Sequence, residues 1–262
     1  DKECRQLVRR IQRKSPESLV VITGCYAQLK PQEIASIPGV DLVLGANAKF
    51  DLASHLKTLK KGDTTKICSC DIEEVSTFNA SWSAEHRTRT FLKVQDGCDY
   101  NCSFCTIPLA RGKSRSDSIQ NVLENIKEIA RTGTKEIIFT GVNLGDFGEN
   151  GEDFFQLIQA VDALPLNLRY RISSIEPNLC THEIIDFVAG SNHFMPHFHM
   201  PLQSGDNEIL SAMRRRYKRE LYLDRVNYIK TKIPDLTGTS NLMVDGCCKS
   251  SADREDRKST RL

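Results

Sequence analysis

The chain has 262 residues, of which 39% are hydrophobic and 27% charged, and its formal net charge is +2. This length can bury a sizeable core, and the near-neutral balance requires any nucleic-acid role to depend on local basic patches. The apolar runs are too short for the roughly 20 residues that cross a bilayer, so no membrane association is expected. Ten cysteines without a secretory signal favour reduced thiols in the cytoplasm over disulfides.

The chain opens with a segment expected to form an amphipathic helix, because Cys4, Leu7, Val8 and Ile11 recur at helical spacing. The other face of this segment is basic and carries Arg5, Arg9, Arg10, Arg13 and Lys14. Those cations suit either a solvated helix face or contacts with nucleic-acid phosphates, and the sequence leaves both readings open.

Strands are expected at 18–24 and 40–47, with a short helix at 31–39 between them. This order indicates a small parallel α/β domain over residues 1–60, incomplete at its beginning because the chain opens without Met. Residues 61–86 keep neither a helical nor a strand period and are expected to form a linker.

From residue 87 onward the chain alternates strands and helices. Strands are expected at 90–95, 135–141, 168–177 and 197–205, and helices at 119–130, 153–164, 181–190, 206–216 and 219–233. The repeats predict an α/β fold with a partial parallel βα barrel over residues 87–246. Residues 247–262 are polar and charged, which is typical of a disordered tail, and they also look non-native.

Three cysteines follow the first barrel strand in the stretch QDGCDYNCSFC, at positions Cys98, Cys102 and Cys105. Thiolates at this density favour zinc or an iron–sulfur cluster. A structural zinc site normally has four ligands, yet no further Cys or His occurs until after Leu179. Three thiolates on a four-iron cube would leave one iron open to a substrate, so the spacing favours the cluster.

Polar residues follow the later barrel strands. Because strand carboxyl ends meet at one face of a βα barrel, Asn143, Ser174, Glu176 and Gln203 are candidates to surround the thiolates. The alternative for each of them is an ordinary cap or turn group.

These residues resemble a known family. C-x3-C-x2-C after a first barrel strand, with the aromatic Phe104 before the last cysteine, is similar to the motif of radical S-adenosylmethionine (SAM) enzymes. More narrowly, the stretches QDGCDYNCSFCTIPLARGKSRS, RISSIEP and HFHMPLQSG resemble the tRNA methylthiotransferases. The nearest branch is the MtaB type, which acts on N6-threonylcarbamoyladenosine beside the anticodon. VVITGCYAQLKP resembles that family's N-terminal domain, and the resemblance covers about residues 1–235.

The resemblance implies SAM and two [4Fe–4S] clusters in the intact enzyme. Cys98, Cys102 and Cys105 would hold the first cluster, and Cys25 would be one of three ligands to the second, the other two preceding residue 1. The four polar candidates would bind SAM. With an electron from a flavodoxin- or ferredoxin-type donor, SAM would be cleaved and a methylthio group added to carbon 2 of the modified adenosine. A chain with only Cys25 of the second ligand set is expected to be inactive in the full reaction.

The tRNA substrate would meet basic residues that lie next to the motifs, namely Arg111, Lys113, Arg115, Arg214, Arg215 and Arg216. Two alternatives remain: an iron–sulfur or zinc RNA-binding module without catalysis, and a radical SAM enzyme of another substrate class. Anaerobic purification separates cluster from zinc, because a cluster protein is brown and a zinc protein is colourless.

Overall fold

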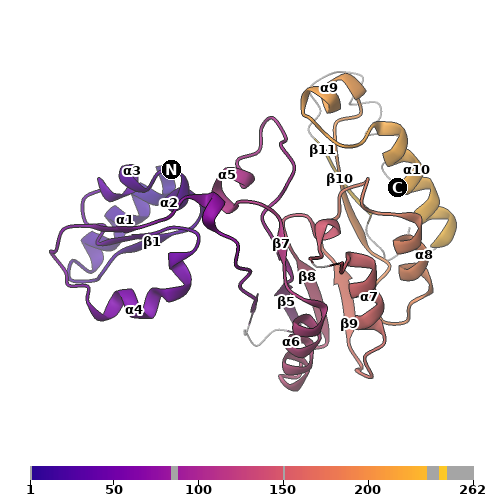
Figure 1. The fold of residues 1–262 in the computed structure, drawn as a ribbon, viewed down its shortest axis with the longest axis horizontal. Helices are drawn as coiled ribbons and strands as arrows, with labels where there is room; N and C mark the ends of the chain where they lie inside the picture. The colour runs from indigo at the N-terminus through magenta and orange to yellow at the C-terminus, as the bar shows by residue number, and fades with distance from the viewer. Residues whose placement is uncertain (1, 84–87, 150, 235–241, 247–262) are drawn as a thin grey trace. The chain divides into compact units, whose positions relative to one another are not determined.

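The computed structural model describes residues 2–83, 88–149, 151–234 and 242–246, and divides the chain into two compact units (Figure 1). Unit 1 comprises residues 1–77 and 106–113, and unit 2 comprises residues 78–105 and 114–262. The division therefore cuts the chain directly after Cys105, and the short segment 106–113 belongs with the N-terminal residues.

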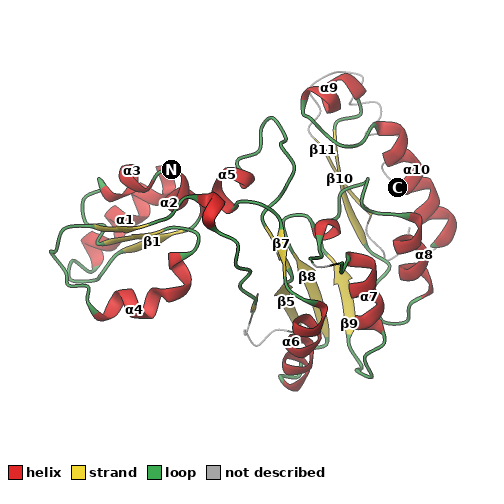
Figure 2. Cartoon of the chain, viewed as in Figure 1, coloured by secondary structure: helices red, strands yellow, loops and turns green. Residues whose placement is uncertain are grey.

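Unit 1 is a small α/β layer (Figure 2). Its elements are α1 (Lys2–Lys14), β1 (Val21–Thr23), α2 (Cys25–Leu29), α3 (Pro31–Ala35), β2 (Leu42–Leu44), η1 (Ala48–Asp51), α4 (Leu52–Lys57), β3 (Lys66–Cys68), η2 (Ile72–Glu74) and α5 (Ile107–Arg111). The strands form a parallel sheet in the order β1-β2-β3, and Thr23, Leu44 and Cys68 share one register row. The expected small parallel domain is confirmed.

The central strand β2 is buried on both faces, as expected for a strand with an unbroken apolar sequence. Val43 packs on one side with Val8 of α1 and Ile34 of α3, whereas Leu42 and Leu44 pack on the other side with Leu59. Leu7, which shares the apolar spacing of α1, is instead 56% exposed.

The segment expected to be a linker, 61–86, contributes structure to unit 1. Strand β3 lies within it and completes the sheet. Polar contacts secure its start: Lys61 Nζ lies 2.8 Å from Asp41 Oδ2, and Thr65 Oγ1 donates to the Val40 carbonyl at 2.7 Å. A strand of three residues is too short to show a period, which is why the sequence pattern indicated none.

Unit 2 is built from alternating strands and helices. Its elements are β4 (Ser81–Trp82), β5 (Arg89–Lys93), β6 (Gln95–Asp96), β7 (Arg115–Ser116), α6 (Ile119–Arg131), β8 (Glu136–Thr140), η3 (Leu144–Asp146), α7 (Phe154–Asp162), β9 (Arg169–Ile172), α8 (His182–Gly190), β10 (Phe198–Gln203), α9 (Asn207–Ala212), α10 (Arg219–Lys232) and β11 (Leu242–Gly246). Figure 1 shows α8 and α10 side by side, where Tyr228 donates to Asp186.

The strands of unit 2 form the predicted part of a parallel βα barrel. β5, β8 and β9 are parallel neighbours, with β4 antiparallel at the edge, and β10 pairs in parallel with β11. A parallel bridge between Tyr170 and Phe194 connects β9 to the segment that leads into β10. Phe139, Tyr170 and Phe194 pack together between the strands and the helices.

Several helices of the barrel begin at residues whose side chains cap the helix. Ser118 accepts from the Asn121 amide, Thr181 from the Ile184 amide, and Asp206 from the Glu208 and Ile209 amides. Asp153 and Gln156 form a reciprocal capping box at the start of α7. These caps fix where each crossover helix starts, and so where each loop at the strand ends begins.

Residues 247–262, expected to form a disordered or non-native tail, lie outside the described residues. Among the residues that the structure describes, no helix has the length and apolar character needed to cross a membrane.

Candidate functional site

The three-cysteine loop leaves unit 2's sheet through β6, whose Gln95 is completely buried. The Gln95 amide nitrogen donates to the carbonyls of Asp96 and Gly97 and to Ser114 Oγ, at 2.9–3.1 Å. Its Oε1 accepts from the amides of Val142 and Asn143 at 2.8 and 3.0 Å. One side chain therefore connects both ends of the cysteine loop to the turn after β8.

The turn after β8 makes room for this glutamine through a glycine. A Cβ at Gly141 would lie 2.8 Å from Gln95 Oε1, closer than real Cβ contacts allow, and 3.0 Å from Gln95 Cβ, which is also tight. The GVN sequence that follows β8 thus has a packing reason for its glycine.

The thiols of the loop are half-buried and electrostatically coupled. Burial, together with nearby Asp146, Cys102 and Cys105, raises the pKa of Cys98 to about 11, although the Tyr100 amide that donates to Cys98 Sγ at 3.4 Å acts in the opposite direction. Burial also raises the pKa of Cys102, and Arg215 opposes that shift. Cys98 and Cys102 are thus held in the protonated form, and nearby positive charge favours their ionisation.

Arg215 anchors one side of the loop. Its side chain is 6% exposed, and its Nη1 lies 2.9 Å from Oε1 of Glu176, whose side chain is 15% exposed. The Arg215 guanidinium also lies over the ring of Phe104, 5.4 Å from the centroid. The backbone supports the same contact, because the Ser103 amide donates to the Met213 carbonyl at 3.2 Å.

Arg216 anchors the beginning of the loop. Its Nη2 donates to the Asp99 carbonyl at 3.0 Å, and its guanidinium lies 4.0 Å from the centroid of the Tyr100 ring. The Tyr100 hydroxyl in turn accepts from the Asn178 side-chain amide at 2.7 Å. The two arginines after α9 therefore contact the loop at both of its aromatic residues.

Two of the four polar residues expected to surround the thiols lie near the cysteine loop in the structure. Asn143 and Glu176 are close to the loop: Asn143 donates to Asp146 at 2.8 Å, and Asp146 and Glu176 both act on the thiol pKa values. Asn143 Oδ1, Asn178 Oδ1 and Glu176 Oε2 are buried without a hydrogen-bond partner among the described residues. Unpaired buried acceptors of this kind require a donor to satisfy them.

The other two expected residues are less informative. Ser174 follows β9 and is half-buried, and its side chain has no hydrogen-bond partner within the described part of the chain. Gln203 ends β10 with φ of 64°, at the point where the β10–β11 register shifts. A left-handed backbone at a residue other than glycine is uncommon and is often found at functional sites.

The donor set of the loop fits a [4Fe–4S] cluster with three protein ligands. It offers three half-buried thiols within one short loop, next to unpaired oxygen acceptors that a cofactor with donor groups would satisfy. Among the described residues, no three His, Cys, Asp or Glu side chains are arranged to hold a single metal ion.

The remaining cysteines are dispersed. Cys25 is exposed at the first position of α2, after Gly24 with φ of 111°, at the carboxyl end of β1. Cys180 is fully buried in the core of unit 2, and burial raises its pKa to about 12. Cys68 Sγ lies 3.8 Å from His55 Nδ1. Cys247 and Cys248 lie outside the described residues.

The six basic residues expected to contact tRNA differ in the unit to which they belong, in burial and in their contacts within the chain. Arg111 ends α5 in unit 1 and Lys113 follows it, whereas Arg115 is buried in β7 of unit 2, 3.7 Å from Asp96 Oδ2. Arg214 is exposed, but Arg215 and Arg216 are held by the cysteine loop. Burial and internal partners thus give Arg115, Arg215 and Arg216 structural contacts that the sequence did not indicate.

Gln95, Tyr100 and Asn178 belong to the site but were not predicted from the sequence. Gln95 had a usable signal, since it is one of two polar residues, with Asp96, between an apolar strand and the first cysteine of the motif. Tyr100 and Asn178 had none, because they meet across 78 residues of chain.

The fold and the loop together define a class of protein. The chain belongs to the radical SAM superfamily, whose sequence model matches residues 92–246. SAM and a [4Fe–4S] cluster, the cofactors expected from the motif, are those of this superfamily.

Within this superfamily, the chain is similar in sequence to tRNA methylthiotransferases. The chain is 36% identical over 252 residues to the threonylcarbamoyladenosine tRNA methylthiotransferase MtaB of Bacillus subtilis, which covers 93% of this chain and 55% of the relative. It is 34% identical over 260 residues to the Aquifex aeolicus MtaB, covering 98% of this chain and 63% of the relative. A tRNA-2-methylthio-N6-dimethylallyladenosine synthase of Clostridium botulinum is 29% identical over 244 residues, covering 91% of this chain and 54% of the relative. The chain thus spans less than two thirds of the length of these relatives.

Solved structures support the fold. The chain resembles the radical SAM methyltransferase TsrM of Kitasatospora setae with a TM-score of 0.63 and 15% identity, over 94% of this chain and 52% of that protein. It resembles the cobalamin-dependent radical SAM enzyme OxsB with a TM-score of 0.61 and 14% identity, over 96% and 40%. At these identities the likeness concerns the fold alone.

Proposed function

We propose that this chain is the part of a tRNA methylthiotransferase that binds the first [4Fe–4S] cluster and SAM. The observation that carries the proposal is the loop of Cys98, Cys102 and Cys105, anchored by Gln95 and Arg215 at the carboxyl end of the barrel strands. Its three thiols match a cluster that keeps one iron free of protein ligands, and that iron would bind SAM.

The residues of unit 2 would serve this cofactor pair by binding and orientation. Glu176 Oε2, Asn143 Oδ1 and Asn178 Oδ1 are buried acceptors without partners among the described residues, and the amino and hydroxyl groups of SAM are donors. Ser174 and Gln203 stay candidates for the same role. The Arg215–Glu176 pair holds its carboxylate in place before any ligand arrives.

The substrate we propose is N6-threonylcarbamoyladenosine in tRNA, methylthiolated at carbon 2. The support is the 32–36% identity to three MtaB proteins, against 28–29% to the dimethylallyladenosine-specific enzymes. Cys25, at an exposed strand end in unit 1, would be one ligand of the second cluster. The electron would come from a flavodoxin- or ferredoxin-type donor.

An anaerobic experiment tests the first half of the proposal. The chain is reconstituted with iron and sulfide, reduced with dithionite and given SAM, and 5′-deoxyadenosine and methionine are quantified. We expect SAM cleavage that the Cys98→Ala, Cys102→Ala and Cys105→Ala variants lose. A colourless protein that retains zinc instead of iron would favour the RNA-binding module without catalysis.

A second assay tests the substrate. Reconstituted protein is incubated with tRNA that carries either threonylcarbamoyladenosine or dimethylallyladenosine, and the nucleosides are analysed by mass spectrometry. The proposal expects a full-length protein with this sequence to give the 2-methylthio product only with the threonylcarbamoyl substrate. A product from the dimethylallyl substrate alone would contradict the MtaB-type assignment.

A further inference from the structure

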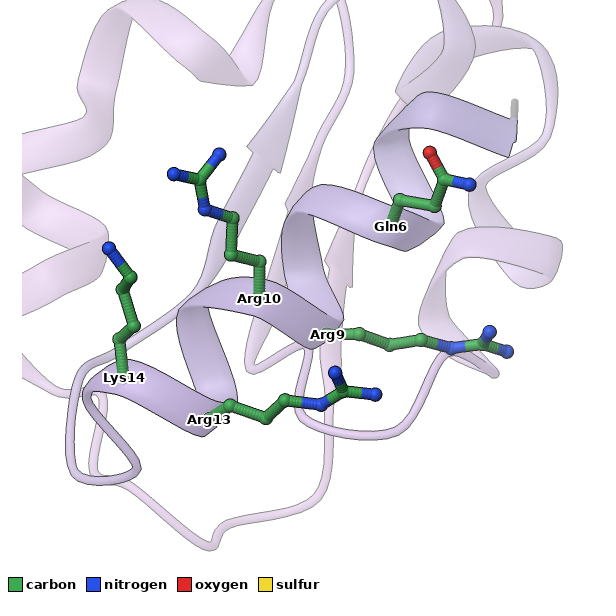
Figure 3. Close-up of a pocket in the computed structure, with 5 residues that line it drawn as sticks. All are labelled: Gln6, Arg9, Arg10, Arg13 and Lys14. Carbon is green, nitrogen blue, oxygen red and sulfur yellow. The ribbon is translucent and has the colours of Figure 1, made fainter.

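The outer face of α1 in unit 1 holds a feature that the proposed catalytic site does not use. An open groove of about 400 Å³ is lined there by Gln6, Arg9, Arg10, Arg13 and Lys14. Figure 3 shows Arg9 and Arg13 extending together on one flank of the helix, while Arg10 and Lys14 extend from the other. Four cations thus face solvent from a single helix.

These four cations lack internal partners. Within the described part of the chain, none of their side chains makes an ion pair or a hydrogen bond. Arg5 on the same helix differs, because its Nη2 lies 2.6 Å from Glu33 Oε1, and the same carboxylate also accepts from Tyr26. Glu33 therefore pairs with Arg5, near the start of α1, and not with the four cations of the groove. No acidic residue is among those that line the groove.

The clustering of these four cations on α1 destabilises the folded chain when no ligand is bound. Arg9 with Arg13, and Arg10 with Lys14, are like-charge pairs at i,i+4, a spacing at which equal charges repel. An anion that bound the groove would relieve this repulsion, so the charge pattern is complementary to a ligand.

We infer that this α1 groove binds the phosphate backbone of RNA. The inference deepens the proposed function, because it assigns part of the tRNA contact to unit 1. Successive cations at i,i+4 lie about 6 Å apart along the helix axis, which suits a repeating backbone charge better than one enclosed anion. The groove is open, and the long side chains can follow a backbone without reading bases.

A membrane surface is the competing polyanion, and the helix does not suit it. An interfacial helix needs an apolar face free to enter the lipid. The apolar residues Val8 and Ile11 of α1 pack in the core of unit 1 instead, and Leu7 is its one large apolar side chain counted as exposed in the described chain.

The test compares two charge-matched double variants of the 262-residue chain, Arg9→Gln/Arg13→Gln and Lys127→Gln/Arg131→Gln. Both remove two cations at i,i+4 from an exposed helix, α1 or α6, and both pairs lack partners among the described residues. Affinity for an unmodified tRNA transcript is measured across a salt series. The slope of log K against log salt should shrink by about 1.4–1.8 in the α1 variant, since each lost phosphate contact removes about 0.7–0.9.

The outcomes separate the inference from the proposed function. Tight, salt-dependent tRNA binding by the parent chain and the α6 variant, with about tenfold weaker binding by the α1 variant at low salt, supports both. An unchanged slope in the α1 variant, or an equal loss in both variants, overturns the groove assignment alone. No tRNA binding by the parent chain overturns the groove assignment, whereas the assignment of the first cluster and SAM is overturned only by the absence of SAM cleavage in the assay above. Binding of phosphatidylserine vesicles through Arg9 and Arg13, with tRNA affinity unaffected, replaces RNA by a membrane.

Discussion

Two basic runs that look alike in the sequence differ in what their side chains contact. In the run after α9, Arg215 pairs with Glu176 at 2.9 Å, and Arg216 donates to the Asp99 carbonyl at 3.0 Å. In α1, Arg9 and Arg13 face solvent and make no polar contact within the described residues. The first run stabilises the cysteine loop, and the second is available to a partner.

The difference teaches that positive charge in a sequence does not assign a role by itself. The partner that decides the role of Arg215 lies 39 residues away in the chain. Once a carboxylate and an aromatic ring cover a guanidinium, its charge is neutralised locally and cannot also hold a phosphate without losing that pair.

The largest expected effect concerns the loop that the first run supports. Replacing Cys98, Cys102 and Cys105 together by Ala should abolish cluster binding, because no described group of three ligands could take over. The measurement is iron content and visible absorbance after anaerobic reconstitution. The tRNA salt slope should be unchanged in this variant, and iron retained at the parent level would contradict the ligand assignment.

The next largest effect is expected from a comparison of two neighbouring arginines, Arg214 and Arg215. Arg215→Ala leaves the carboxylate of Glu176 buried without its cation, which should lower the free energy of unfolding by about 3 kcal/mol. Arg214→Gln is the control, because Arg214 is exposed and has no side-chain partner among the described residues. Urea unfolding measures both.

A double variant then tests the cause of that loss. Adding Glu176→Gln to Arg215→Ala should recover part of the stability, because a neutral amide is less costly to bury than a lone carboxylate. Equal stability of the Arg214 and Arg215 variants would mean that the two arginines do not differ as described.

His197 is a buried base, and its Nδ1 lacks a hydrogen-bond partner among the described residues. It tests whether charging a buried group without a partner lowers stability. Burial, helped by nearby Arg171 and His199, lowers the pKa of His197 from 6.5 to about 4. Below pH 6.5 the unfolded chain gains a proton that the folded chain takes up only near pH 4. Stability should therefore fall as the pH drops from 6.5 to 4, by up to about 3 kcal/mol.

The contribution of His197 is measured by difference. The free energy of unfolding of the parent and of His197→Gln is followed by denaturant titration between pH 4 and 7.5. The variant should lose less stability over this range, and parallel curves would show that His197 does not take part.

The smallest effect concerns the α1 groove. Arg9→Gln/Arg13→Gln removes a like-charge pair, so it should leave stability unchanged or raise it by about 0.2–0.5 kcal/mol at low salt. Thermal unfolding at low and high salt measures the difference, which salt should diminish. A loss above 1 kcal/mol would indicate that these arginines support the fold, contrary to their solvent-facing position.

Much of the barrel was predictable because its segments are long and periodic. Helix α6 begins at the expected residue and ends within one residue of the expected range, and the cysteine loop follows β5 and β6 as the motif required. The two-residue strands β4, β6 and β7 were not predictable, since two residues show no period.

The part of the candidate site that depends on the spacing of cysteines was predictable from the sequence. The part that depends on contacts between residues distant in sequence was not. The cysteines were found from their pattern, but the pairing of Arg215 with Glu176 and the five hydrogen bonds of Gln95 depend on the folded chain. The burial of Arg115 in a two-residue strand was not predicted either, because the sequence grouped it with the basic residues expected to contact tRNA.

The placement of α5 has a consequence for dividing the protein into fragments. Residues 106–113 interrupt unit 2 directly after its last cluster cysteine, yet they belong to unit 1, where α5 packs against α2. No single cut of the chain can therefore release unit 2 intact, because a cut at residue 77 leaves α5 behind without α2. A separable cluster-binding fragment would need a second change, a short polar replacement of 106–113 that joins Cys105 to Ser114.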